Sequence, residues 1–234
     1  ADDAALAGAT VVNPSEVLAT HLLEVIKSNL ARLIGMKSLR RLLDALTTLS
    51  NSERSEANRR MLDEMIPDRV PMDLLLSVAR FLLEERVSIR NLPLILESIS
   101  EVRGAGVSPD VIGEHVRQKL AFQILADHRA QAGSVPLEQL APAWEATFAT
   151  YTRGDGPAPD VALPPETFRK LTDSILEKIN VASDHGHYPA LVTSSRRRRF
   201  LKTILGTKGI SNPVVSFEEL AQENKPALIG LVPA

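Results

Sequence analysis

The chain has 234 residues, enough to bury a sizeable core in one or two domains. Its formal net charge of −2 favours neither nucleic acid nor an anionic membrane as a general partner. It has no cysteine, which excludes disulfides, cysteine-ligated zinc and thiol catalysis. The aromatic residues are 6 Phe, 2 Tyr and 1 Trp, so the core must be largely aliphatic, which suits helix packing. No apolar run approaches the roughly 18 residues that span a bilayer.

The first predicted helix begins beside Asn13. Asparagine is a favourable N-cap, and Pro14 suits the first helical position because its missing N–H has no intrahelical partner there. Apolar residues then recur at helical spacing to about Ile34, where Gly35 interrupts the pattern. The spacing therefore predicts a helix over 14–34.

Two further helices are predicted before a sharp corner. Leucines at helical spacing indicate a helix over 37–49, and the polar stretch 50–55 indicates a connection. A helix over 56–66 ends before Pro67, and Pro71 opens the helix that leads into the corner. All of this part is predicted to be helical.

The corner itself joins two apolar helix faces. Ser88 and Asn91 both offer side-chain oxygens that can cap the second helix, and Pro93 then falls in its first turn. The second face is formed by Leu92, Ile95, Leu96 and Ile99. We interpret the corner as a packing device, since it carries no residue suited to catalysis.

The second half mixes helices with short strands. Ser108 and Pro109 predict a helix that runs to about residue 129. The later predicted helices cover 140–151, 165–182 and 196–205, and the predicted strands cover 135–137, 190–193, 214–216 and about 228–232.

Strand–helix–strand order predicts a small α/β domain. The predicted fold class is therefore α+β but mostly α, with an all-helical domain over 35–107 and an α/β domain with a short sheet over 108–234. Gly104 and Gly106 loosen the chain at this boundary.

Four consecutive arginines, 196–199, are the most obvious candidate site. Such a run can bind phosphate, nucleic acid or an acidic protein. Successive residues on a helix point about 100° apart, so the four cannot form one flat patch. We expect an exposed helix face in which Arg196 and Arg197 contact an acidic partner. A nucleic-acid-binding or regulatory helical module that uses this basic helix is the alternative.

Other reactive side chains lack the spacing that chemistry requires. His185 and His187 are two residues apart, whereas a helical zinc site uses two histidines four apart, and no second cluster supplies further ligands. Ser194 and Ser195 follow a predicted strand without the Gly-x-Ser-x-Gly pattern, and capping explains both. We expect no metal, no cofactor and no enzymatic activity.

Four segments carry a resemblance to a known family. They are VVNPSEVLATHL (11–22), EERVSIRNLPLILE (84–97), IGEHVRQKL (112–120) and PALVTS (189–194), which precedes the basic helix. In this order they resemble segments of the export-gate family of flagellar and type III secretion systems. Asn91 stands where the family segment has aspartate, and either residue can cap a helix.

The resemblance implies a bacterial inner-membrane protein whose N-terminal part spans the membrane, with this chain on the cytoplasmic side. Residues 1–34 would then end a preceding cytoplasmic subdomain. The family forms a nine-membered homo-oligomeric ring that receives secreted substrates and their chaperones, beside other export-apparatus components. We expect these partners, and no nucleic acid.

The resemblance also gives Thr20 a role. In the family, the threonine of the ATHL segment lines a hydrophobic depression that receives chaperone–substrate complexes. The alternative is a helix threonine whose hydroxyl donates to a carbonyl one turn earlier. Both hypotheses remain open at this point.

Overall fold

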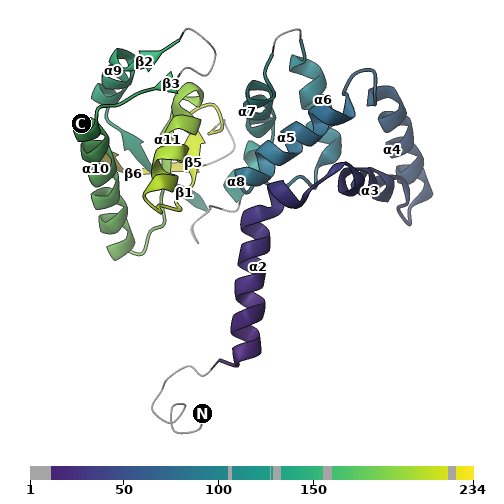
Figure 1. Ribbon diagram of the computed structural model, residues 1–234, viewed down its shortest axis with the longest axis horizontal. Coiled ribbons are helices and arrows are strands. Elements are labelled where there is room, and N and C mark those ends of the chain that lie inside the picture. Colours follow the sequence, from purple (N-terminus) through teal and green to yellow (C-terminus); the bar gives the residue numbers. More distant parts are fainter. Residues whose placement is uncertain (1–11, 105–106, 127, 129–132, 155–159, 221–224) are drawn as a thin grey trace. The chain divides into compact units, whose positions relative to one another are not determined.

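The computed structural model describes residues 12–104, 107–126, 128, 133–154, 160–220 and 225–234 (Figure 1). The chain divides into two compact units, Ala1–Gly113 and Glu114–Ala234. The described part is mostly helical with one small parallel sheet, so the predicted α+β class is confirmed. The predicted domain limits at residues 34 and 107 stay predictions. Across these ranges, no helix combines the length and apolar character needed to cross a membrane.

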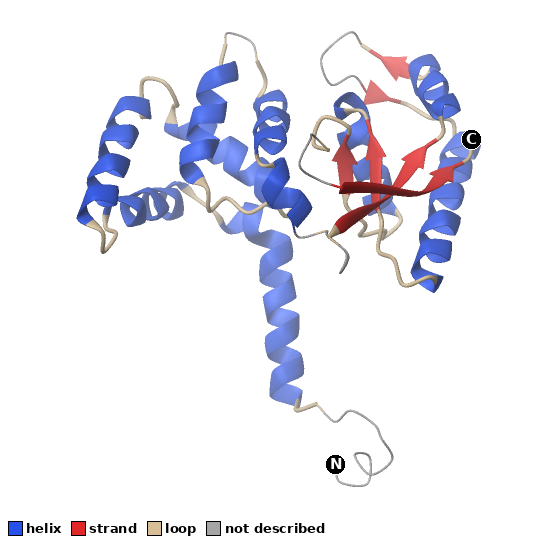
Figure 2. Ribbon diagram, turned by 180° about the vertical axis from the view of Figure 1, so that it is seen from behind, coloured by secondary structure: helices blue, strands red, loops and turns tan. Residues whose placement is uncertain are grey.

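Helix α2 (Pro14–Leu33) starts as predicted and projects from the first unit (Figures 1 and 2). Asn13 Oδ1 accepts a hydrogen bond from the Ser15 N–H at 3.0 Å, which confirms the cap. The C-terminal end of the helix is held to the rest of the unit by hydrogen bonds. Arg80 donates to the Ile34 carbonyl from Nε at 3.3 Å and from Nη2 at 3.1 Å. The helix is therefore anchored mainly at its C-terminal end.

The rest of the first unit packs helix on helix. Its further helices are α3 (Met36–Thr47), α4 (Ser52–Met65), α5 (Met72–Glu84) and α6 (Leu92–Val102). The predicted apolar faces of the last two are buried, through Leu75, Val78, Phe81 and Leu82 of α5 and Leu92, Ile95, Leu96 and Ile99 of α6. Helix α4 begins earlier than predicted because Asn51 Oδ1 accepts from the Arg54 N–H at 2.9 Å and caps it.

The corner after α5 is a Schellman motif. The Val87 N–H donates to the Leu82 carbonyl at 2.8 Å, and the Arg86 N–H donates to the Leu83 carbonyl at 3.1 Å. Val87 and Leu82 are both buried, which supplies the apolar contact typical of this cap. Arg86 has φ +58°, the left-handed conformation that this position usually gives to glycine. An arginine therefore holds a strained backbone at the corner.

The predicted capping of α6 by the Asn91 side chain is wrong. Asn91 occupies the N-cap position, with Pro93 in the first turn, but its side chain makes no capping hydrogen bond to any residue that the structure describes. Its ψ of 60° lies outside the extended region that N-cap residues adopt. Ser88 Oγ instead accepts from the Arg90 N–H, within the connection.

The second unit holds the sheet (Figure 2). The helix predicted to reach residue 129 is two helices, separated by a turn at Leu120. They are α7 (Pro109–Lys119), which begins in the first unit and ends in the second, and α8 (Ala121–Ala126); residue 129 lies outside the described residues. The elements that follow are β1 (Ser134–Leu140), α9 (Pro142–Thr150), β2 (Thr152–Arg153), β3 (Asp160–Val161), α10 (Pro165–Asp184), β4 (Ala190–Thr193), α11 (Ser195–Thr207), β5 (Val214–Ser216) and β6 (Lys225–Val232). Strands β4 and β5 lie where the sequence predicts them.

The sheet has the order β5-β4-β1-β6, and all its neighbouring strands are parallel. Successive apolar residues of a strand belong to different clusters on opposite faces of the sheet, as Leu191 and Val192 of β4 do. One cluster contains Leu140, Trp144, Phe148, Leu171, Ile175, Ile179, Leu191, Leu201, Ile204, Leu205, Val214 and Val232. The other contains Leu125, Val135, Leu137, Ala190, Val192 and Val215. The central strands are therefore covered on both faces.

Glu138 is a carboxylate buried inside this sheet. It is 3% exposed, and its Oε2 has no hydrogen-bond partner in the described part of the chain. It pairs with Gly230 of β6, where an added Cβ would overlap the carboxylate. Burial raises the pKa of Glu138, and the charge of Lys178 opposes that shift. The side chain is tolerated because Gly230 makes room for it.

We predict that Arg86→Gly stabilises the fold by about 0.5–1 kcal/mol, since glycine adopts the left-handed conformation without strain. Chemical denaturation of both proteins measures this difference. Arg90→Gly, in the same connection, is the control and should not stabilise. A loss of stability in Arg86→Gly would show that the left-handed backbone at Arg86 does not destabilise the protein.

We also predict that Glu138→Gln stabilises the protein at neutral pH. A raised pKa in the folded state means that the folded protein binds more protons than the unfolded one above the ordinary value of 4.5. Stability therefore falls as pH rises through the folded-state pKa, and glutamine removes that fall. Thermal melts at several pH values test this, with exposed Glu177→Gln as the control; an equal pH dependence in both variants would refute it.

Candidate partner-binding site

Thr20 lies on an apolar helix surface that is open to solvent. The large apolar residues of α2 are exposed, from 37% at Leu30 to 69% at Leu18. Thr20 is exposed too. Its hydroxyl makes no hydrogen bond to a described residue, whereas Ser28 Oγ donates back to the Glu24 carbonyl at 2.8 Å. The back-bonded threonine considered from the sequence is therefore not found.

The side of α2 that carries Thr20 also carries an ion pair. Residues seven apart on a helix lie on nearly the same side, so Lys27 follows Thr20 along the axis. Lys27 Nζ lies 2.9 Å from Glu24 Oε1. The hydrogen bond and charge of Lys27 lower the pKa of Glu24, and the charge of Arg86 acts in the same direction. This side therefore leads from Thr20 to the corner after α5.

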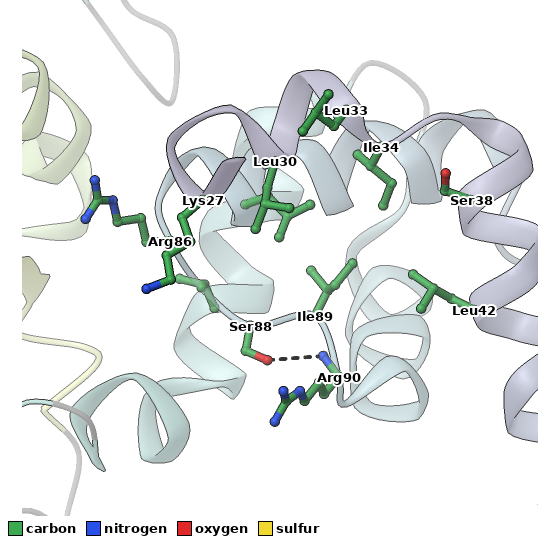
Figure 3. Close-up of a pocket in the computed structure, with 12 residues that line it drawn as sticks. Lys27, Leu30, Leu33, Ile34, Ser38, Leu42, Arg86, Ser88, Ile89 and Arg90 are labelled. Carbon is green, nitrogen blue, oxygen red and sulfur yellow. Dashed lines mark hydrogen bonds between the residues drawn. The ribbon is translucent and has the colours of Figure 1, made fainter. Parts of the chain in front are cut away.

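At that corner the first unit contains a groove of about 700 Å³ (Figure 3). Three elements form it: the C-terminal end of α2, the start of α3, and the connection after α5. Its lining residues are Lys27, Leu30, Leu33, Ile34, Ser38, Leu42, Leu83, Arg86, Val87, Ser88, Ile89 and Arg90. No sequence pattern predicted this groove, although the connection lies in one of the segments that carry the family resemblance.

The arginine run does not form an open basic patch. Arg197 is 5% exposed and Arg198 is fully buried, whereas Arg196 is exposed. Arg197 Nε lies 3.4 Å from Glu145 Oε2, and its guanidinium lies 6.0 Å from the centre of the Phe148 ring. Arg196 and Arg197 were the two residues expected to contact an acidic partner. Only Arg196 of these two is exposed, so only Arg196 is accessible to such a partner.

Arg198 is instead part of the core of the second unit. Its guanidinium makes two hydrogen bonds to the carboxylate of Glu114 on α7, with Nε at 2.8 Å from Oε2. A second buried pair joins Arg117 Nε to Glu219 Oε1 at 2.8 Å, with side chains 3% and 1% exposed. Glu219 also accepts from the Ser216 N–H at 2.8 Å. Arg198 thus joins α11 to α7, and Arg117 joins α7, through Glu219, to the end of β5.

The predicted capping by Ser194 is wrong. Ser194 occupies the N-cap of α11, but no capping bond from its side chain is found among the described residues; its Oγ donates to Glu145. The Ser195 N–H donates to Glu218 Oε2 at 3.1 Å, so a carboxylate satisfies this helix terminus. Both serines thus have structural partners.

His185 lies at the end of α10, where its Nδ1 is 2.7 Å from the Val181 carbonyl. In the described ranges, no three His, Asp or Glu side chains are grouped as a metal site requires.

Comparison with known proteins identifies relatives along the whole chain. The FHIPEP family is matched over residues 1–225. The flagellar biosynthesis protein FlhA of Caulobacter vibrioides is 32% identical over 231 residues, which are 99% of this chain and 32% of that relative. The chain thus spans about a third of that protein.

Solved structures share the fold. The Chlamydia pneumoniae CdsV protein matches with a TM-score of 0.78 at 21% identity, over 99% of this chain and 64% of that chain. A further structure holds CdsV in complex with CdsO. The nonameric SctV-C of EPEC matches with a TM-score of 0.73 at 21% identity, over 90% of this chain and 61% of that chain.

We predict that Arg198→Ala destabilises the protein by about 3 kcal/mol, because it leaves the Glu114 carboxylate without its buried partner. Arg196→Ala, at the exposed position of the same run, should change stability by less than about 0.5 kcal/mol. Urea unfolding of both variants measures the contrast. Equal effects would show that Arg198 is not a structural residue.

Proposed function

The chain belongs to the FHIPEP family of flagellar and type III secretion export gates, and from this we propose that it is a docking platform for export substrates and chaperone–substrate complexes. It acts by reversible binding and carries out no bond chemistry. We further propose that the intact protein resides in the bacterial inner membrane, with this part on its cytoplasmic side.

The observation that carries the proposal is the open apolar surface of α2 around Thr20. A continuous apolar surface of this kind marks a contact, either with another part of the intact protein, of which this chain spans about a third, or with a partner, and we propose the partner. The apolar residues around Thr20, including Val17 and Leu23, are about half exposed. A helix presented in this way offers apolar contacts that an incoming chaperone or substrate can bury.

Ring assembly is the second element of the proposal. The nonameric state of the structural relative supports a nine-membered homo-oligomer for the intact protein. The CdsV–CdsO complex supports contacts with other export-apparatus components. A ring multiplies each docking surface, so weak individual contacts gain avidity.

The nucleic-acid-binding alternative is not favoured. Binding to phosphate backbones needs several open cations on one surface. Two members of the basic run, Arg197 and Arg198, are buried and engaged with Glu145 and Glu114.

We predict that Thr20→Asp in the intact protein weakens chaperone–substrate binding by at least about tenfold, because a carboxylate would be buried in an apolar contact. Pull-down and calorimetry with the chaperone–substrate complexes of the same organism measure this.

The matched control is Thr203→Asp, which places the same charge at an exposed position of α11. It should bind like the unaltered protein. Equal binding by both variants would remove Thr20 from the site.

A further inference from the structure

We propose that the groove beside the corner after α5 binds a short acidic amphipathic helix of a partner protein. This site is separate from the surface at Thr20 and does not require that Thr20 contacts a chaperone. The groove combines an apolar floor with three basic side chains, Lys27, Arg86 and Arg90. This combination defines the chemistry of its occupant.

The floor of the groove comes from three elements. Leu30 and Ile34 at the end of α2, Ile89 of the connection and Leu42 of α3 face a common hollow (Figure 3). No described residue closes the walls, since Leu33 is 60% exposed and Leu42 is 40% exposed. An open apolar groove fits the side chains of a helix, whereas small ligands occupy more enclosed sites.

Among the described residues, the basic side chains at the groove are not all paired with acidic side chains. Arg86 and Arg90 form no ion pair there, and none of the residues that line the groove is a carboxylate. Glu24, whose charge interacts with that of Arg86, is paired with Lys27. The residues that line the groove therefore include three cations and no carboxylate, which places positive charge beside apolar surface. Charge complementarity therefore selects a partner whose apolar face is flanked by Asp or Glu.

The backbone at Arg86 is an independent observation. Its φ of +58° is a conformation that glycine adopts at no cost, yet the residue is an arginine whose side chain lines the groove. Strained residues cluster at binding sites, where the side chain has a use that offsets the strain. We infer that Arg86 is present for its charge.

The test uses a fluorescein-labelled peptide of about 14 residues, with Leu at helical spacing on one face and Glu elsewhere. Fluorescence anisotropy with the intact protein should show saturable binding that weakens as salt is raised. The same peptide with Lys in place of Glu should not bind. Absence of binding by the acidic peptide, or equal binding by both peptides, overturns the proposal.

Protein variants locate the site. The double variant Arg86→Glu, Arg90→Glu should weaken peptide binding by at least about tenfold. Arg32→Glu is the matched control, because Arg32 is an exposed cation of α2 about 140° round the helix from Lys27. If Arg32→Glu weakens binding as much, the peptide is attracted by the overall charge of the surface and the groove is not the site.

Two single variants separate binding from folding. Arg86→Gly should bind the peptide about threefold more weakly even though it melts at a higher temperature. Glu24→Gln should bind it about threefold more tightly, because the competing carboxylate is removed. Unchanged affinity in both variants would overturn the role of Arg86 and Glu24 in binding.

Other occupants give distinct results. If the double variant abolishes self-association in sedimentation velocity while the peptide does not bind, the groove takes a second copy of this chain. If vesicles of phosphatidylglycerol and phosphatidylcholine bind and the peptide does not, it takes anionic lipid. Either result overturns the proposal. Thr20→Asp should retain peptide binding, so this test and the chaperone test fail independently.

Discussion

The left-handed backbone at Arg86 is the constraint on which the first unit depends. Because the chain turns there through a Schellman motif, Val87 enters the core beside Leu82 instead of continuing the helix. The connection can then run beside the end of α2, where Ile89 and Arg90 line the groove. A regular continuation of α5 would remove both the corner and the groove. One strained residue thus links the packing of the helices to the surface that they present.

Charged residues serve two different purposes in this chain. In the second unit, Arg117 and Arg198 lie in the core, where they pair with Glu219 and Glu114. The hydrogen bonds of each pair offset the free energy that the charged groups lose when they leave water. In the first unit, Arg86 lies at the surface beside exposed leucines. The same side-chain chemistry therefore fixes tertiary structure in one place and leaves charge for a partner in the other. Burial decides which purpose applies.

Local sequence patterns predicted most of the secondary structure. Asn13 and Pro14 start α2, and the short runs of mostly apolar residues at 190–193 and 214–216 are local enough to be recognised as strands without the fold. The errors fall where a side chain finds a distant partner. Ser194 occupies the predicted N-cap, yet the carboxylate of Glu218 satisfies the helix. Asn91 likewise holds the position without the bond, because the path of the connection sets its backbone.

The sequence by itself determined the fold class, the order of the elements and membership of the export-gate family, because helical periodicity, caps and family segments are local properties. It could also place Thr20 on a helix. Only the tertiary structure decided that no described residue covers the apolar face of α2, that Arg197 and Arg198 are buried, and that three separated segments form one groove. Burial and cavity shape depend on contacts between residues far apart in the chain, and no local pattern records them.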